Sequence, residues 1–137
     1  MTHLVVLDCE AIQALQDPGH PKHLRVVSYA QVVASRKRRA VAIQMAVPTA
    51  VRVEAGWDRT SSAWVFTNRL RITDSPLDTA SANTAAGIRD RTGVSVADSH
   101  LGAVIQSALH DQITVVTSDP GDMRMVAGDK NITVTAI

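Results

Sequence analysis

Four carboxylates lie at positions where a folded protein seldom leaves an acid without a chemical role. Asp8 directly follows an apolar run, and Asp119 lies two residues beyond a β-branched run. Both are therefore expected at the carboxyl ends of buried strands. Glu54 and Asp98 instead fall on the apolar faces of two expected helices, because hydrophobic residues recur around each of them with helical spacing.

The grouping of these acids predicts a divalent metal site. A carboxylate that faces a core costs roughly several kcal/mol unless a cation or hydrogen-bond donors compensate it. No lysine or arginine stands among the four acids, which come from separate segments. Carboxylates without histidine or cysteine ligands suit Mg²⁺ or Mn²⁺ better than zinc. Such an ion activates water and neutralises the charge that builds on a phosphodiester, so the pattern is nuclease-like.

Each acid also has a purely structural interpretation. The two strand-end acids could be ordinary loop residues or helix caps, and Asp98 could be only the N-cap of its helix. Glu54 could pair with Arg52 or Arg89. Further along the chain, Asp122 fits an acid favoured by a helix dipole.

Two other features are open to interpretation. His100, two positions after Asp98, is expected to point away from that acid and to have a structural or surface role. The basic run Arg36–Arg39 is either a solvated helix end or a patch that contacts phosphates.

Short β-branched runs alternate with amphipathic helices, which is typical of α/β units around a parallel sheet. If the strands before Asp8 and Asp119 are neighbours, their acids share one crevice where the strand order reverses. We expect one domain, residues 1–137, without internal repeats. The expected strands are residues 4–8, 41–47, 70–73, 113–117 and 132–137, and the expected helices are residues 10–16, 24–37, 48 to beyond 54, 61–68, 76–91, 96–110 and 120–127. Ser75 is the expected N-cap of the helix that ends near Gly93.

Composition narrows the function classes. The formal net charge is only +1, so nucleic-acid binding would need a local basic patch. Aromatic residues make up 3% of the chain, which disfavours base-stacking platforms. Cys9 is the single cysteine and excludes an internal disulfide; we expect it to be a small core residue. With no signal peptide and no membrane-spanning apolar run, a cytoplasmic protein is expected.

Four short motifs follow one another along nearly the whole chain. They are residues 4–12, 48–54, 96–101 and 115–123, and the last contains the sequence Thr117-Ser118-Asp119. In this order they resemble PIN domains, and specifically the VapC-type toxin nucleases of bacterial toxin–antitoxin operons. Ser99, where a small apolar residue is commoner, and residues 60–71, which match no motif, are the departures.

The resemblance implies a PIN-like, Rossmann-like three-layer α/β/α sandwich with a central, mostly parallel sheet. It also implies Asp8, Asp98 and Asp119 as direct ligands of Mg²⁺ or Mn²⁺. Glu54 would hold metal-bound water or a second ion, and the Thr117 hydroxyl would orient a carboxylate. The implied activity is hydrolysis of RNA by an endoribonuclease. The implied partners are a VapB-like antitoxin and a second copy of the chain in a homodimer.

Three other functions fit the sequence less well. A PIN domain could process RNA outside a toxin–antitoxin pair, or it could be a binding module without catalysis. A flavodoxin-like receiver also gathers acids around Mg²⁺ at strand ends. However, it needs an acidic pair after its first strand, and this chain has the single Asp8 there.

Overall fold

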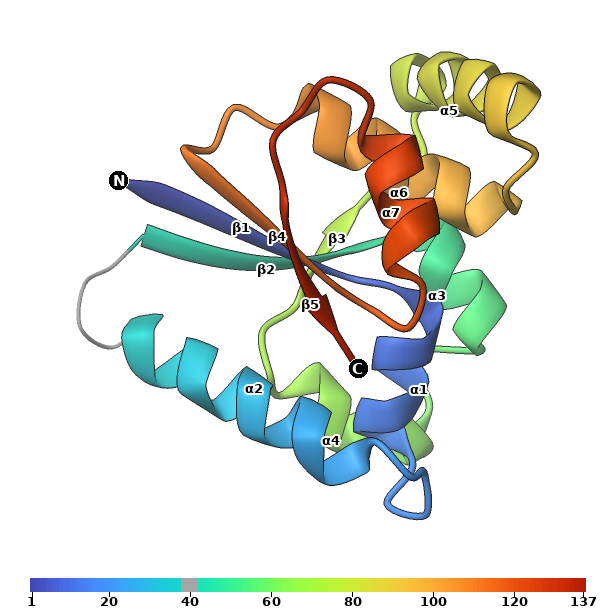
Figure 1. Cartoon of the computed structure of the whole chain (residues 1–137). Coiled ribbons are helices and arrows are strands. Elements are labelled where there is room, and N and C mark those ends of the chain that lie inside the picture. The colour runs from blue at the N-terminus through green and yellow to red at the C-terminus, as the bar shows by residue number, and fades with distance from the viewer. Residues whose placement is uncertain (38–41) are drawn as a thin grey trace.

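A computed structural model describes residues 1–37 and 42–137 of the chain. Its centre is a parallel sheet of five strands in the order β3-β2-β1-β4-β5, shown in Figure 1. The strands are β1 (Thr2–Leu7), β2 (Ala42–Pro48), β3 (Thr73–Ser75), β4 (Gln112–Thr117) and β5 (Thr133–Ala136). The α/β class predicted from the sequence is confirmed.

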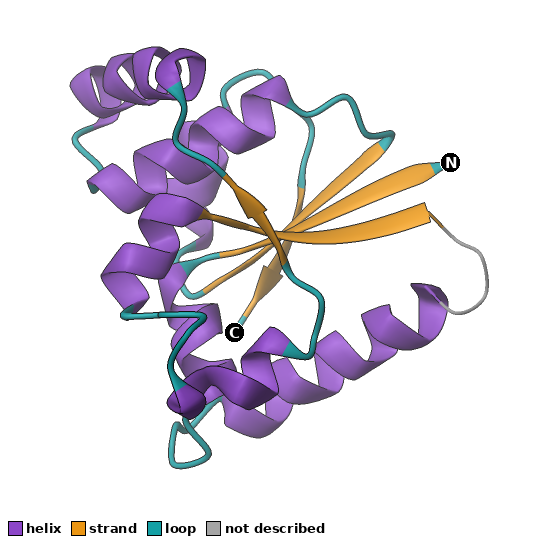
Figure 2. Cartoon of the chain, turned by 180° about the vertical axis from the view of Figure 1, so that it is seen from behind, coloured by secondary structure: helices purple, strands orange, loops and turns teal. Residues whose placement is uncertain are grey.

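Helices cover both faces of this sheet and make it the middle of three layers. The helices are α1 (Cys9–Gln16), α2 (His23–Lys37), α3 (Thr49–Ala55), α4 (Val65–Asn68), α5 (Thr79–Thr92), α6 (Val96–Ser107) and α7 (Pro120–Ala127), with a short 3₁₀ turn at Ser62–Trp64. Figures 1 and 2 show α2 and α4 against one face, and α5, α6 and α7 on the other. Helices α1 and α3 lie near the carboxyl ends of the central strands.

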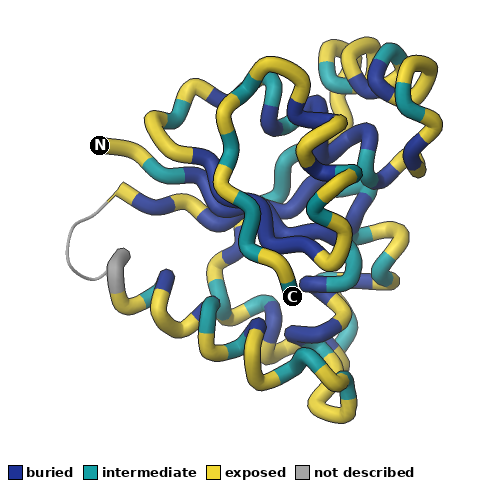
Figure 3. Tube along the Cα trace, viewed as in Figure 1, coloured by how far each residue is buried: buried dark blue, intermediate teal, exposed yellow. Residues whose placement is uncertain are grey.

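The core lies along the two central strands. The last four residues of β1 and the last five of β4 are all buried, which Figure 3 shows as a continuous dark band. This lack of alternation is expected for parallel strands that are covered by helices on both faces. Residue Leu7 pairs with Val116, so β1 and β4 are neighbours, as predicted. The acids that follow these two strands are thereby brought to the same edge of the sheet.

Some predicted boundaries are wrong. Ser75 does not cap α5; it ends β3, where it pairs with Pro48 of the neighbouring strand. The cap of α5 is Asp78, whose side chain accepts a hydrogen bond from the Ser81 N–H. Helix α6 ends at Ser107, before the expected end at residue 110.

The basic run Arg36–Arg39 lies outside the residues whose side chains the structure describes. Within the described residues, every helix is too short or too polar to span a bilayer.

Candidate metal centre

Asp8 lies at the sheet edge with its carboxylate turned into the protein. It is the N-cap of α1, and it is only 5% exposed. Oδ1 accepts a hydrogen bond from the Ala11 N–H at 2.8 Å, and Oδ2 accepts one from the Ser118 N–H at 3.2 Å. Burial raises the pKa of Asp8, and the hydrogen bonds from Thr117, Ala11 and Ser118 partly offset that rise. Asp8 is therefore a helix cap and a buried strand-end acid at the same time, so the structural interpretation does not exclude the chemical one.

Thr117, the last residue of β4, joins Asp8 to Asp119. Its side chain is fully buried. Oγ1 accepts a hydrogen bond from the Asp119 N–H at 2.9 Å, so the hydroxyl proton is free to be donated to Asp8. Thr117 thus fixes the Asp8 carboxylate against the first residues of the loop that follows β4.

Asp119 itself is exposed and caps α7. Its Oδ1 accepts a hydrogen bond from the Asp122 N–H at 3.2 Å. Asp122 is half-buried, and burial followed by the charge of Asp119 raises its pKa. Asp122 is therefore both a first-turn acid of α7 and a direct neighbour of a predicted ligand.

Asp98 is the acid on which the charges of the other candidate ligands act. It is not the N-cap of α6, because Ser95 caps the helix and accepts from the Asp98 N–H at 3.1 Å. The Asp98 side chain is half-buried, and its pKa is raised to about 6. Burial is the largest cause, followed by the charges of Asp8, Glu54, Asp122 and Asp119. The structure thus brings Asp8, Glu54, Asp119 and Asp122 within electrostatic reach of Asp98.

The predicted position of Glu54 on an apolar helix face is wrong. Glu54 is exposed, and its neighbour Val53 is 81% exposed. Helix α3 has only seven residues, so its apolar spacing says little about which side faces the core. Within the described residues, neither Arg52 nor Arg89 forms an ion pair with Glu54. Glu54 still reaches the site, since its charge acts on Asp98.

Cys9, expected as a small core residue, packs only partly against the core. Its half-buried thiol lies next to the acids rather than only in the core. Burial raises its pKa to about 12, and the charges of Glu54 and Asp8 and a hydrogen bond to Glu54 add to that rise. Without a bound metal the thiol therefore keeps its proton at neutral pH.

Hard oxygen donors fit Mg²⁺ or Mn²⁺ in type and charge. In residues 1–37 and 42–137, no three acidic, histidine or cysteine side chains already converge as a ligand set for one ion. The carboxylates repel one another, as the raised pKa of Asp98 indicates. A divalent cation would remove that repulsion and let them approach.

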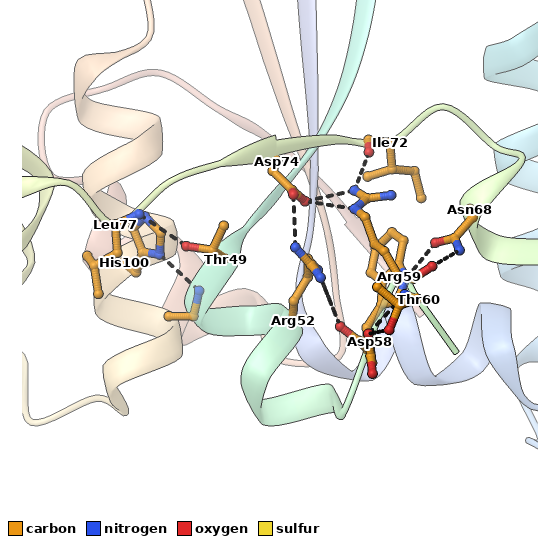
Figure 4. Close-up of polar contacts among 12 residues, drawn as sticks. Thr49, Arg52, Asp58, Arg59, Thr60, Asn68, Ile72, Asp74, Leu77 and His100 are labelled. Atoms are coloured by element: carbon orange, nitrogen blue, oxygen red, sulfur yellow. Dashed lines mark hydrogen bonds and ion pairs between the residues drawn. The ribbon is translucent and has the colours of Figure 1, made fainter. Parts of the chain in front are cut away.

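A second polar cluster, which no sequence motif indicated, holds the far end of α3. Asp74 accepts from Arg52 Nη1 at 2.8 Å and from Arg59 Nη2 at 2.7 Å (Figure 4). The Arg59 guanidinium also lies over the Trp57 ring, 4.3 Å from its centroid. Trp57 in turn stacks on Trp64 with centroids 5.6 Å apart. This cluster ties the helix that carries Glu54 to the edge strand β3.

No family model matches the chain, and no curated protein matches it. Solved structures do. The chain is similar to the crystal structure of FitAcB from Neisseria gonorrhoeae, with 20% identity, 95% of each chain covered and a TM-score of 0.54. It is also similar to FitAB bound to the IR36 DNA fragment, with 19% identity, 96% of this chain and 94% of that chain covered, and a TM-score of 0.57.

The chain shares their fold. This confirms the PIN-like three-layer arrangement that the motif order implied. The order β3-β2-β1-β4-β5 also excludes a flavodoxin-like receiver, whose order is 2-1-3-4-5. The chain passes from β1 to β2 on one side and from β4 to β5 on the other side, so the strand order reverses between the neighbours β1 and β4. Asp8 and Asp119 follow those two strands, where open α/β sheets bind ligands.

Proposed function

We propose that the chain is a Mg²⁺- or Mn²⁺-dependent endoribonuclease and the toxin of a toxin–antitoxin pair. The observation that carries this proposal is the environment of Asp98. Burial, and then the charges of four other carboxylates, raise the pKa of this half-buried acid. Two of those acids, Asp8 and Asp119, follow the neighbouring strands β1 and β4 at the sheet's switch point. Groups arranged to repel one another lower stability, and such arrangements are concentrated at functional sites.

Each of the predicted site residues would have its own role in metal binding. Asp8, Asp98 and Asp119 would hold the ion, and Glu54 would hold a water or a second ion. A bound Mg²⁺ or Mn²⁺ would supply charge neutralisation at the phosphodiester and an activated water. Thr117 would keep the Asp8 carboxylate in one orientation. Asp119 and Glu54 are exposed, so an RNA strand would approach from their side.

The toxin assignment rests on two supports. The motifs resemble VapC-type nucleases in order and position, and the fold is that of the FitAB structures. A VapB-like antitoxin would then be the inhibitor, with a segment that covers the acidic cluster. A homodimer is part of the same proposal.

The decisive experiment measures cleavage of a labelled, structured RNA with Mn²⁺ or Mg²⁺. It compares the wild type with Asp98→Asn and with Asp129→Asn, an exposed acid in the turn after α7. We expect cutting by the wild type and by Asp129→Asn, none by Asp98→Asn, and none with EDTA. Equal cutting by all three proteins would indicate a contaminating ribonuclease. No cutting by any of them, across several RNAs, would favour a binding module.

A further inference from the structure

Helix α3 begins without a cap of its own. Its N-cap residue is Pro48, which makes no side-chain hydrogen bond to the first turn. The first N–H groups of any helix lack partners within the helix and need acceptors from elsewhere. An isolated helix as short as the seven residues of α3 is marginal in water, so its placement depends on its contacts.

His100 supplies the missing acceptor from another helix. Its Nδ1 accepts a hydrogen bond from the Ala50 N–H at 3.3 Å, the group that a capping side chain ordinarily satisfies (Figure 4). His100 belongs to α6 and is 0% exposed. Beside it, the Thr49 hydroxyl accepts from the Leu77 N–H at 3.1 Å.

The ring is suited to this role in its neutral form. Because Nδ1 accepts, the ring proton must be on Nε2. The ring is fully buried, and the bond from the Ala50 N–H is the hydrogen bond that the structure gives to Nδ1.

We propose that His100 is a positioning residue that caps α3 from α6. The cap thereby fixes the position of Glu54 on α3 relative to Asp98 on α6. His100 follows Asp98 by two residues on the same helix, so the cap and the acid move as one rigid unit. Glu54 lies in the next turn of α3 after Ala50. The cap acts at one end of α3, and the ion pair between Arg52 and Asp74 acts toward the other.

This inference rests on the proposed function for its effect on metal binding, but not for the cap itself. Two substitutions distinguish the hydrogen-bond acceptor of His100 from the space that its side chain fills. His100→Leu fills similar space without an acceptor, whereas His100→Asn places its side-chain oxygen where Nδ1 was. Ile105→Val is the matched control, because it trims another fully buried side chain of α6.

Two readouts are needed: amide hydrogen exchange at Ala50 by NMR and Mn²⁺ affinity by calorimetry. We expect His100→Leu to speed exchange at Ala50 roughly tenfold or more. We expect the same variant to weaken Mn²⁺ binding about tenfold, as for other residues that orient a ligand. His100→Asn and Ile105→Val should stay close to the wild type in both readouts.

Unchanged exchange at Ala50 in His100→Leu would overturn the cap. Equal Mn²⁺ loss in His100→Leu, His100→Asn and Ile105→Val would reduce the effect to packing and overturn the positioning role. If the wild type binds no Mn²⁺, the proposed function fails, while exchange still decides the cap. If His100→Leu does not fold, Ala50→Pro removes the donor instead, and an Mn²⁺ affinity equal to the wild type's would overturn the positioning role.

Discussion

Asp98→Asn should stabilise the metal-free protein at neutral pH. In the folded chain the Asp98 carboxylate is half-buried among other acids, which raises its pKa from 3.8 to about 6. An acid with a raised pKa binds its proton more tightly when folded, so its contribution to stability is present below the unfolded pKa and is lost as pH rises through 6. At pH 7.5 the charged Asp98 therefore lowers the free energy of unfolding, and a neutral amide relieves that cost.

The size of the effect follows from the two pKa values. A rise from 3.8 to about 6 corresponds to about 3 kcal/mol in full. Solvent screening of a half-buried group reduces this to about 1–2 kcal/mol. Asp98 also lies in the first turn of α6, where losing its charge costs about 0.3–1 kcal/mol of favourable helix-dipole interaction. The net gain is on the order of 1 kcal/mol, or roughly 2–5 °C in melting temperature.

The assay is thermal unfolding at pH 7.5 and pH 4.0 in EDTA, with Asp129→Asn as the control. The gain should be clear at pH 7.5 and nearly absent at pH 4.0, where wild-type Asp98 is already protonated in the folded chain. Asp129→Asn should show no such difference. Mn²⁺ should raise the melting temperature of the wild type far more than that of Asp98→Asn. A variant that is no more stable than the wild type at either pH would refute the electrostatic reasoning.

Three further substitutions test other parts of the structure. A Cβ on Gly102 would lie 2.8 Å from both the Cβ and the carbonyl oxygen of Val126, so Gly102→Ala should lower the free energy of urea unfolding by about 1–3 kcal/mol. Asp74→Ala leaves both of its arginine partners without their carboxylate and should cost about 1–2 kcal/mol in the same measurement, whereas an unchanged midpoint would mean that the cluster adds nothing. Thr117→Val keeps the shape of the buried side chain but removes the hydroxyl at Asp8, and calorimetry should show about tenfold weaker Mn²⁺ binding.

The parts of the fold that could be predicted from sequence are those that a single buried segment determines. The strand before Asp8 is an apolar run and the strand before Asp119 is a β-branched run, because both lie in the centre of the sheet with helices on both sides. A parallel order then places their acids at one edge, which is why that half of the candidate site was predictable.

Other features depend on contacts between distant segments, and no local sequence pattern predicts them. The sequence from Ser75 to Asp78 offers two candidate caps, and only the pairing of Ser75 with Pro48 selects Asp78. Glu54 was misplaced because a seven-residue helix gives too few turns for a reliable periodicity. The ion pairs of Asp74 join residues 15 and 22 positions apart, and no motif marks them.

The central pairing of β1 with β4 also affects when the site can form during synthesis. The Asp8 N–H donates to the Val116 carbonyl, and the Ser118 N–H donates to the Asp8 carboxylate, across 110 residues of chain in the second case. Contacts of such long separation form late, after the intervening chain has been made. A ribosome would therefore have to translate the chain as far as β4 and the loop after it before Asp8 and Asp119 could meet. A nascent chain interrupted before β4 would carry Asp8, Glu54 and Asp98 but could not assemble the full acidic cluster.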